Sequence, residues 1–91
     1  LSLTGATEAA IAACRRALKI TEQPSQQARI YRRIGKLYEV HNQVHALNYY
    51  QQAVERFAEN DSELIDLLKD RAWIYILREE WSSAERDLIW P

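Results

Sequence analysis

Residues 28–60 read ARIYRRIGKLYEVHNQVHALNYYQQAVERFAEN, and this stretch decides the fold. It contains the pattern YxxIGxxY at residues 31–38 and the pattern AxxxYxxA at residues 46–53. Apolar residues at this spacing share one face of a helix. A glycine inside a helix costs about 1 kcal/mol relative to alanine, so Gly35 needs a packing reason. Close approach of two helices supplies that reason, and the stretch therefore predicts a tightly packed helix pair.

Related patterns recur on both sides of this stretch. The second pattern returns as AxxxCxxA at residues 10–17 and as AxxxL at residues 84–88. In the same way, GxxY at residues 35–38 returns as AxxY at residues 72–75. The offsets between equivalent positions are about 36 to 38 residues. Self-similarity at such a period is typical of helical repeat proteins.

The order and spacing of these patterns resemble the tetratricopeptide repeat, a helix–turn–helix unit of about 34 residues. The resemblance implies an all-α fold of antiparallel helix hairpins, about five helices in all, stacked as an α-solenoid. It divides the single domain at residues 1–91 into parts of a longer array: a partial repeat at 1–24, a full repeat at 25–60 and a nearly full, truncated repeat at 61–91. Arg71 departs from the family pattern, because it stands where a leucine is expected.

Helix start and stop signals predict five segments, at about residues 7–20, 25–40 or 41, 44–59, 63–78, and from 81 or 82 onward. We expect Ser25 to be an N-cap, Asn42 to adopt the left-handed conformation of a helix–helix turn, and residues 60–62 to form a turn and N-cap cluster. The resemblance makes Gly5 a turn glycine and residues 1–4 the end of a missing helix. Trp90 is expected either to be covered by a following unit or to be an incidental exposed aromatic.

The composition also bears on the location of the protein. No apolar run approaches the roughly 20 residues that a membrane span needs, and the N-terminus does not resemble a signal peptide. Cys14 is the only cysteine and cannot form an internal disulfide, which favours a reducing, cytoplasmic location. Its position among small residues predicts that it packs as a small hydrophobe.

The chain shows no pattern typical of catalysis. It has no glycine-rich phosphate loop, no Ser/His/Asp ordering and no Cys-x-x-Cys pair, so we expect no enzyme activity, no catalytic residue and no cofactor. His41 and His45 have a spacing that chelates metal on a continuous helix, but the helix is expected to break at Asn42. Two solvated turn histidines are therefore expected in place of a metal site.

In proteins of this family, the first helix of each unit lines a concave groove. Carried over by position, the resemblance assigns the following residues to that groove: Arg29, Arg32, Lys36, Glu39, Val40, Asp66, Lys69, Trp73, Ile76 and Leu77. The sequence adds a fourth basic residue, Arg33, to the three from residues 29–36 in this list. Four basic side chains at i, i+3, i+4 and i+7 share one helix face: Arg29, Arg32, Arg33 and Lys36. The residues expected to bind a partner are Arg29, Arg32, Arg33, Lys36, Lys69 and Trp73.

Two interpretations of the basic face are open. The first is that Asp66 and Asp70 of the neighbouring helix pair with it, and the second is that it binds an acidic peptide or a carboxylate terminus. Trp73 has two interpretations as well. It is either an exposed anchor for a partner or a residue buried against the adjacent helix.

The leading hypothesis is a non-catalytic protein–protein interaction module within a larger signalling or regulatory protein, binding a protein or an acidic peptide. The alternative is self-association, or a spacer role. It is motivated by the net charges of +5 at residues 1–38 and −6 at residues 39–91, and by an apolar C-terminal edge at residues 89–91. The acidic second half argues against nucleic-acid binding. No membrane partner is expected.

Overall fold

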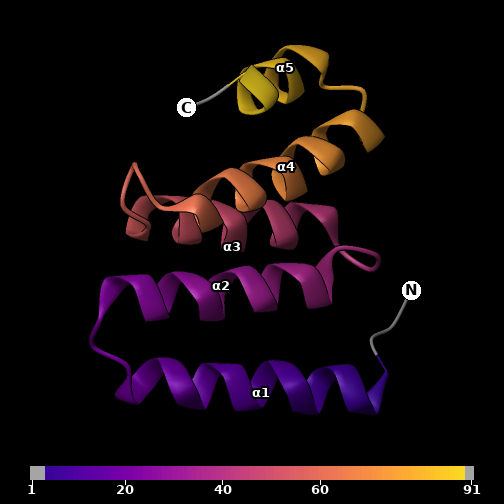
Figure 1. Cartoon of the computed structure of the whole chain (residues 1–91). Helices are drawn as coiled ribbons and strands as arrows, with labels where there is room; N and C mark the ends of the chain where they lie inside the picture. Colours follow the sequence, from indigo (N-terminus) through magenta and orange to yellow (C-terminus); the bar gives the residue numbers. More distant parts are fainter. Residues whose placement is uncertain (1–3, 90–91) are drawn as a thin grey trace.

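Within residues 4–89, five α-helices follow one another and are joined by short turns (Figure 1). This computed structural model describes residues 4–89, with the side chains of all of these except residues 81, 82 and 89. The helices are α1 (Gly5–Ile20), α2 (Pro24–Tyr38), α3 (Gln43–Arg56), α4 (Ser62–Leu77) and α5 (Trp81–Ile89). No strand occurs among the described residues, so the all-α prediction is confirmed. Within the same range, no helix combines the length and the apolar character that a membrane span requires.

Polar side chains cap α1, α3 and α4 at their N-termini. Thr4, Asn42 and Asp61 each accept a hydrogen bond from a backbone N–H two or three residues later, over 2.9–3.2 Å. Each bond satisfies one of the donors that the first turn of a helix leaves without a partner. The predicted N-cap cluster at residues 60–62 is therefore confirmed through Asp61.

The left-handed residue is not the one predicted. Asn42 has a φ of −152°, because it caps the start of α3 and does not end α2. Among the described residues the left-handed conformation occurs at Glu79, with a φ of 59°, in the turn after α4. There the backbone N–H of Glu80 donates to the carbonyl oxygen of Tyr75 at 2.7 Å and closes the end of the helix.

Two helix boundaries also differ from the prediction. Ser25 lies inside α2; Gln23 is the N-cap residue, and Pro24 takes the first helical position, where its missing N–H needs no partner. α3 ends at Arg56 and not at residue 59. The reason is that Phe57 is extended, with a φ of −75° and a ψ of 143°, and its side chain is buried in the core.

The N-terminus differs from the expectation drawn from the family. Gly5 is the first residue of α1 and not a turn residue, and a Cβ added there would meet no atom within 4 Å. Thr4 is extended, so it does not end a preceding helix. Residues 1–3 and Trp90, on which the other predictions about the chain ends depend, lie outside the described residues.

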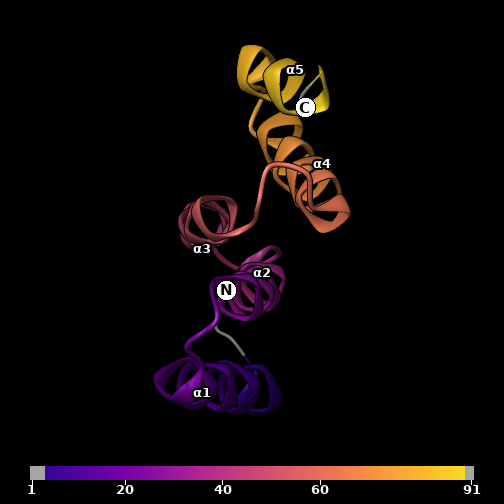
Figure 2. The ribbon, with the colours of Figure 1, turned by 60° about the vertical axis from the view of Figure 1, so that its left-hand side comes forward.

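The helices lie in two staggered layers. Consecutive helices run antiparallel (Figure 1), and α3 lies to the left of α2 and α4 in the turned view of Figure 2. Side-chain bonds connect α1 with α3 and α2 with α4. The Cα trace spans 34 × 33 × 14 Å. The shortest of these lengths matches two layers of helices whose axes are about 8–10 Å apart.

The starts of the helices recur at a fixed interval. α1, α3 and α5 begin at residues 5, 43 and 81, while α2 and α4 begin at residues 24 and 62. In both sets the interval is 38 residues, the upper end of the range that the sequence patterns predict. Each interval therefore holds two helices that form one antiparallel pair.

α2 and α3 approach each other closely at Gly35. A Cβ added to Gly35 would lie 2.5 Å from Cε1 and 2.6 Å from Cδ1 of Tyr50, far inside the separation of non-bonded carbons. Tyr50 is fully buried, and its hydroxyl donates to Glu39 Oε2 at 2.8 Å. Burial raises the pKa of Tyr50, and the bond to Glu39 raises it further. The predicted packing reason for Gly35 is confirmed: the glycine makes room for an aromatic ring.

Alanine, leucine and isoleucine side chains, with Phe57, fill the rest of the core. The other buried apolar residues are Ile11, Ala28, Ile34, Ala46, Ala53, Phe57, Leu64, Leu67, Leu68, Ala72, Ile74 and Ala84. The two tyrosines of the YxxIGxxY pattern, Tyr31 and Tyr38, are only half-buried. Cys14 is also half-buried and is a free thiol.

We expect Gly35→Ala to lower the free energy of unfolding, although alanine favours a helix by about 1 kcal/mol. The added methyl group would collide with the ring of Tyr50, which its burial and its hydrogen bond to Glu39 prevent from moving aside. Overpacking a core costs roughly 1–3 kcal/mol, so a net loss of up to about 2 kcal/mol is expected in urea unfolding followed by circular dichroism. Gly5→Ala is the matched control and is expected to cost nothing, because its Cβ would meet open space. Equal effects of the two substitutions would contradict this account.

Candidate functional site

α2 gathers the four predicted basic residues around one hollow. Arg29, Arg32, Arg33 and Lys36 follow one another at helical spacing and, with Glu63 of α4, line a shallow hollow of about 350 Å³. We term this hollow and its lining side chains the basic groove. It lies where α2 runs beside α4, so both helices determine its shape.

Acidic side chains of α4 pair with three of the four basic side chains. Arg29 Nε donates to Glu63 Oε2 at 2.7 Å. Arg32 Nε donates to Asp70 Oδ2 at 2.8 Å, and Lys36 Nζ lies 3.3 Å from Asp70 Oδ1. The interpretation that acids of the neighbouring helix pair with the basic face is therefore confirmed for Asp70.

The same ion pairs show how the two helices lie. They connect residue 29 with residue 63 and residue 36 with residue 70, so α2 and α4 run parallel. Asp66, which was also expected to pair, makes no ion pair with α2 in the described part of the chain. Its side chain is exposed and lies about 60° from that of Glu63 and about 40° from that of Asp70 around the helix.

The basic groove keeps a surplus of positive charge. Four basic side chains face two carboxylates, and Arg33 is exposed with no carboxylate within 4.0 Å among the described residues. On the exposed face of α4, Asp66 and Lys69 cancel each other's charge. The paired groups are partly exposed, and such pairs each contribute only about 0–1 kcal/mol, so an incoming acidic group can compete for them.

The two predicted site residues of α4 lie outside the lining of the basic groove. Lys69 is exposed, and Trp73 is 53% exposed, so the alternative that Trp73 is buried against an adjacent helix is wrong. Leu77 lies one helical turn further along and is 49% exposed. Val40, which follows α2, is 81% exposed. Because α2 and α4 run parallel, these three apolar side chains lie at the same end of the helix pair.

The histidines do not form a metal site in the described structure. No group of three or more His, Cys, Asp or Glu side chains in residues 4–89 could hold a metal ion. His45 is exposed, with its ring 5.2 Å from that of Tyr38. His41 is half-buried, and its Nδ1 is buried without a hydrogen-bond partner. The prediction of two solvated histidines is therefore wrong for His41.

A buried ion pair connects α4 with α5. Arg71 and Asp87 are 8% and 4% exposed, and Arg71 Nε and Nη2 each donate to an oxygen of Asp87 at 2.7 Å. Burial alone would lower the pKa of Arg71, but the hydrogen bonds and the charge of Asp87 outweigh it and raise the pKa. Sequence reasoning noted Arg71 as a charged residue in a leucine position but did not find Asp87. The signal in the sequence was a charged residue at a helix position where an apolar residue is expected.

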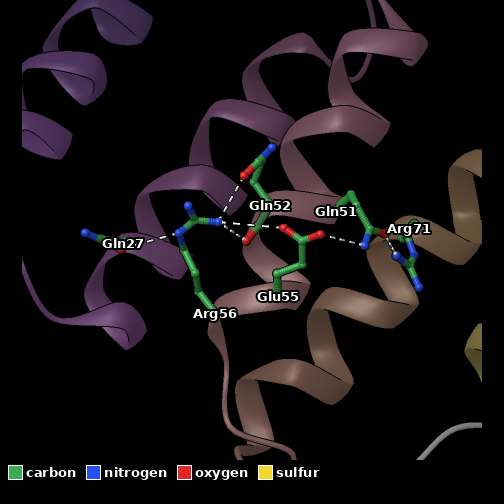
Figure 3. Close-up of polar contacts among 6 residues, drawn as sticks. All are labelled: Gln27, Gln51, Gln52, Glu55, Arg56 and Arg71. Carbon is green, nitrogen blue, oxygen red and sulfur yellow. Dashed lines mark hydrogen bonds and ion pairs between the residues drawn. The ribbon is translucent and has the colours of Figure 1, made fainter.

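Polar contacts extend from Arg71 across α3 to α2 (Figure 3). They connect, in order, Asp87, Arg71, Gln51, Glu55, Arg56 and Gln27. Gln27 then donates to the carbonyl oxygen of Thr21 in the turn before α2, at 2.8 Å. The middle links are long, 3.5 Å from Gln51 to Glu55 and 4.0 Å from Glu55 to Arg56. These links therefore orient side chains more than they stabilise the fold.

We expect Asp87→Ala to lower the free energy of unfolding by about 3–5 kcal/mol, because it leaves the charge of Arg71 buried without a partner. Replacing both Arg71 and Asp87 with leucine should restore most of the loss, since well-packed apolar groups often substitute for a buried ion pair. Urea unfolding measures both effects. Glu80→Ala is the control, because its pair with Arg78 is exposed and should contribute at most about 1 kcal/mol. If Asp87→Ala lowers the free energy of unfolding by as little as the control does, the buried ion pair does not stabilise the fold as proposed.

Relatives provide no further constraint on the site. Comparison of the chain with models of protein families, with curated proteins and with solved structures finds no match. The functional argument therefore depends on the geometry and charge of the side chains described above.

Proposed function

We propose that the chain is a non-catalytic protein-interaction module that binds an acidic segment of a partner protein in the basic groove. One observation carries the proposal: four basic side chains surround a hollow in which two carboxylates pair with only three of them. A surplus of positive charge attracts an acidic segment and speeds the encounter. The fork of an arginine also matches the two oxygens of a carboxylate.

The proposal includes a repeat architecture. Two helices in each 38-residue interval, with α1 beside α3 and α2 beside α4, support a stack of hairpins that resembles tetratricopeptide repeats. In this arrangement the ranges 1–24, 25–60 and 61–91 belong to successive units of an α-solenoid. α2 and α4 are then the first helices of their units and face the partner.

The apolar side chains beside the groove narrow the chemistry of the partner. Val40, Trp73 and Leu77 are exposed near the C-terminal ends of α2 and α4. Tryptophan and arginine are enriched among the residues that contribute most to interfaces. The partner segment therefore combines acidic residues with a bulky apolar residue that lies against Trp73.

A fluorescein-labelled peptide rich in glutamate and ending in phenylalanine tests this function by fluorescence anisotropy. We expect binding that weakens between about 50 and about 150 mM NaCl, because the contacts are exposed charges. Arg33→Gln should weaken binding about threefold or more, and Trp73→Ala about tenfold. Arg33 is the informative position because its substitution breaks none of the ion pairs between α2 and α4.

Arg16→Gln is the matched control for Arg33→Gln. It removes the same charge from an exposed position on α1, away from the groove. A peptide of the same length in which lysine replaces glutamate should not bind. If Arg16→Gln weakens binding as much as Arg33→Gln does, the attraction is non-specific and the groove assignment is wrong.

Self-association is the second candidate function, and Leu88 favours it. This residue of α5 is 56% exposed, beside the apolar edge that the sequence predicts at residues 89–91, whose side chains lie outside the described structure. Sedimentation velocity over a wide concentration range, at low and high salt, should then show a dimer or larger assembly that Leu88→Glu dissociates. A monomer under every condition would exclude this role.

A further inference from the structure

A second hollow lies on the other side of α2, between α1 and α3. It has a volume of about 340 Å³ and is lined by Arg15, Tyr31, His45, Asn48, Tyr49 and Gln52. We term it the tyrosine pocket. On α2, the side chains of Tyr31 and Arg33 point about 160° apart, so the pocket is separate from the basic groove. Its volume is at the lower end of the roughly 300–1,000 Å³ that small-molecule sites have.

Three tyrosine rings stack beside the pocket. The centroids of Tyr38 and Tyr49 are 5.6 Å apart with 5° between the ring planes, and those of Tyr31 and Tyr49 are 6.2 Å apart. The guanidinium of Arg56 lies over Tyr31, 4.6 Å from the centroid. The faces of these rings therefore already contact other side chains of the protein. A ligand would bind to the polar groups of the pocket.

The hydroxyl groups of this stack position Arg15. Its Nη2 donates to the hydroxyl of Tyr49 at 3.0 Å and to that of Tyr38 at 3.3 Å. The hydrogen bond to Tyr49 is the main reason that the pKa of Arg15 is raised. Both bonds use one nitrogen, so Nε and Nη1 keep their N–H donors for another partner. Within residues 4–89, no carboxylate lies within 4.0 Å of this guanidinium.

The other lining side chains add neutral donors. Gln52 Oε1 accepts a hydrogen bond from Arg56 at 3.0 Å, which turns the Nε2 amide group and its two N–H donors away from Arg56 (Figure 3). Asn48 and His45 are exposed and each carry an N–H group. None of the residues that line the pocket is an aspartate or a glutamate. An adjoining hollow, which shares Arg15 with this pocket, has Glu8 in its lining.

We propose that the tyrosine pocket binds a small oxyanion, the carboxylate or phosphate group of a small molecule. A guanidinium that is already positioned loses little freedom on binding, and its remaining N–H groups form charge-assisted hydrogen bonds to anionic oxygens. Arg29 and Arg32 differ in this respect, because a carboxylate already occupies each of them. The proposal does not depend on the basic groove.

Nuclear magnetic resonance titration of the ¹⁵N-labelled chain tests the proposal, with sodium acetate and sodium phosphate as separate probes at ionic strength held constant with chloride. We expect saturable shifts of the Arg15 Nε–H signal and of the Gln52 side-chain amide, with a Kd below about 10 mM for at least one probe. Shifts with acetate alone would show that the pocket binds a carboxylate, and shifts with phosphate alone would show that it binds a phosphate group. Shifts with both would show that it binds either group. Shifts with neither probe would overturn the proposal.

Arg15→Gln should weaken the binding about tenfold or more, because it removes the charged donor. Tyr49→Phe keeps the ring stack but removes one hydroxyl that holds Arg15, so a smaller loss is expected. Arg16→Gln is the control and should leave the titration unchanged, and the spectrum of each variant reports whether it folds. If Arg16→Gln weakens binding as much as Arg15→Gln does, the anion is held by general surface charge and the pocket assignment is wrong.

Discussion

The contact between Gly35 and Tyr50 is the constraint on which the rest of the structure depends. Because glycine places no side chain here, α2 approaches α3 until the buried ring of Tyr50 fills the space above its backbone. This approach accompanies the most extensive helix contact in the described molecule, between α2 and α3. It leaves two sides of α2 for other neighbours: one side meets α4 and the other meets α1. The two candidate binding surfaces are consequences of that division.

The two surfaces hold positive charge in different ways. In the basic groove Arg29 and Arg32 already have carboxylate partners, so a ligand must exchange one carboxylate for another. Several weak exchanges along one helix suit a long and flexible acidic segment, whose affinity depends on many contacts. In the tyrosine pocket Arg15 is held by neutral hydroxyl groups, so a ligand need displace only water. This arrangement suits one compact anion.

Features that depend on the local chain could be predicted from the sequence, and features that depend on how helices rotate against one another could not. The helical segments, the reason for Gly35 and the basic face of α2 follow from residue spacing. The N-cap role of Asp61 follows from its residue type.

The partner of the basic face depends on which side of α4 faces α2. For this reason Glu63 pairs with the basic face, whereas Asp66 does not. Arg71 and Asp87 meet only because of the way α5 lies on α4. Asn42 suits both a left-handed turn and an N-cap, and the length of the turn decides between them.

The extensive contacts in this structure join helices that are neighbours along the chain, and the pairs α2 with α3 and α4 with α5 are the largest. A cluster of buried apolar side chains joins α2, α3 and α4. α1, with an extensive interface on one side only, should open and close many times while the α2–α3 pair stays shut. The rate of amide exchange should therefore be highest in α1 and lower in α2 and α3.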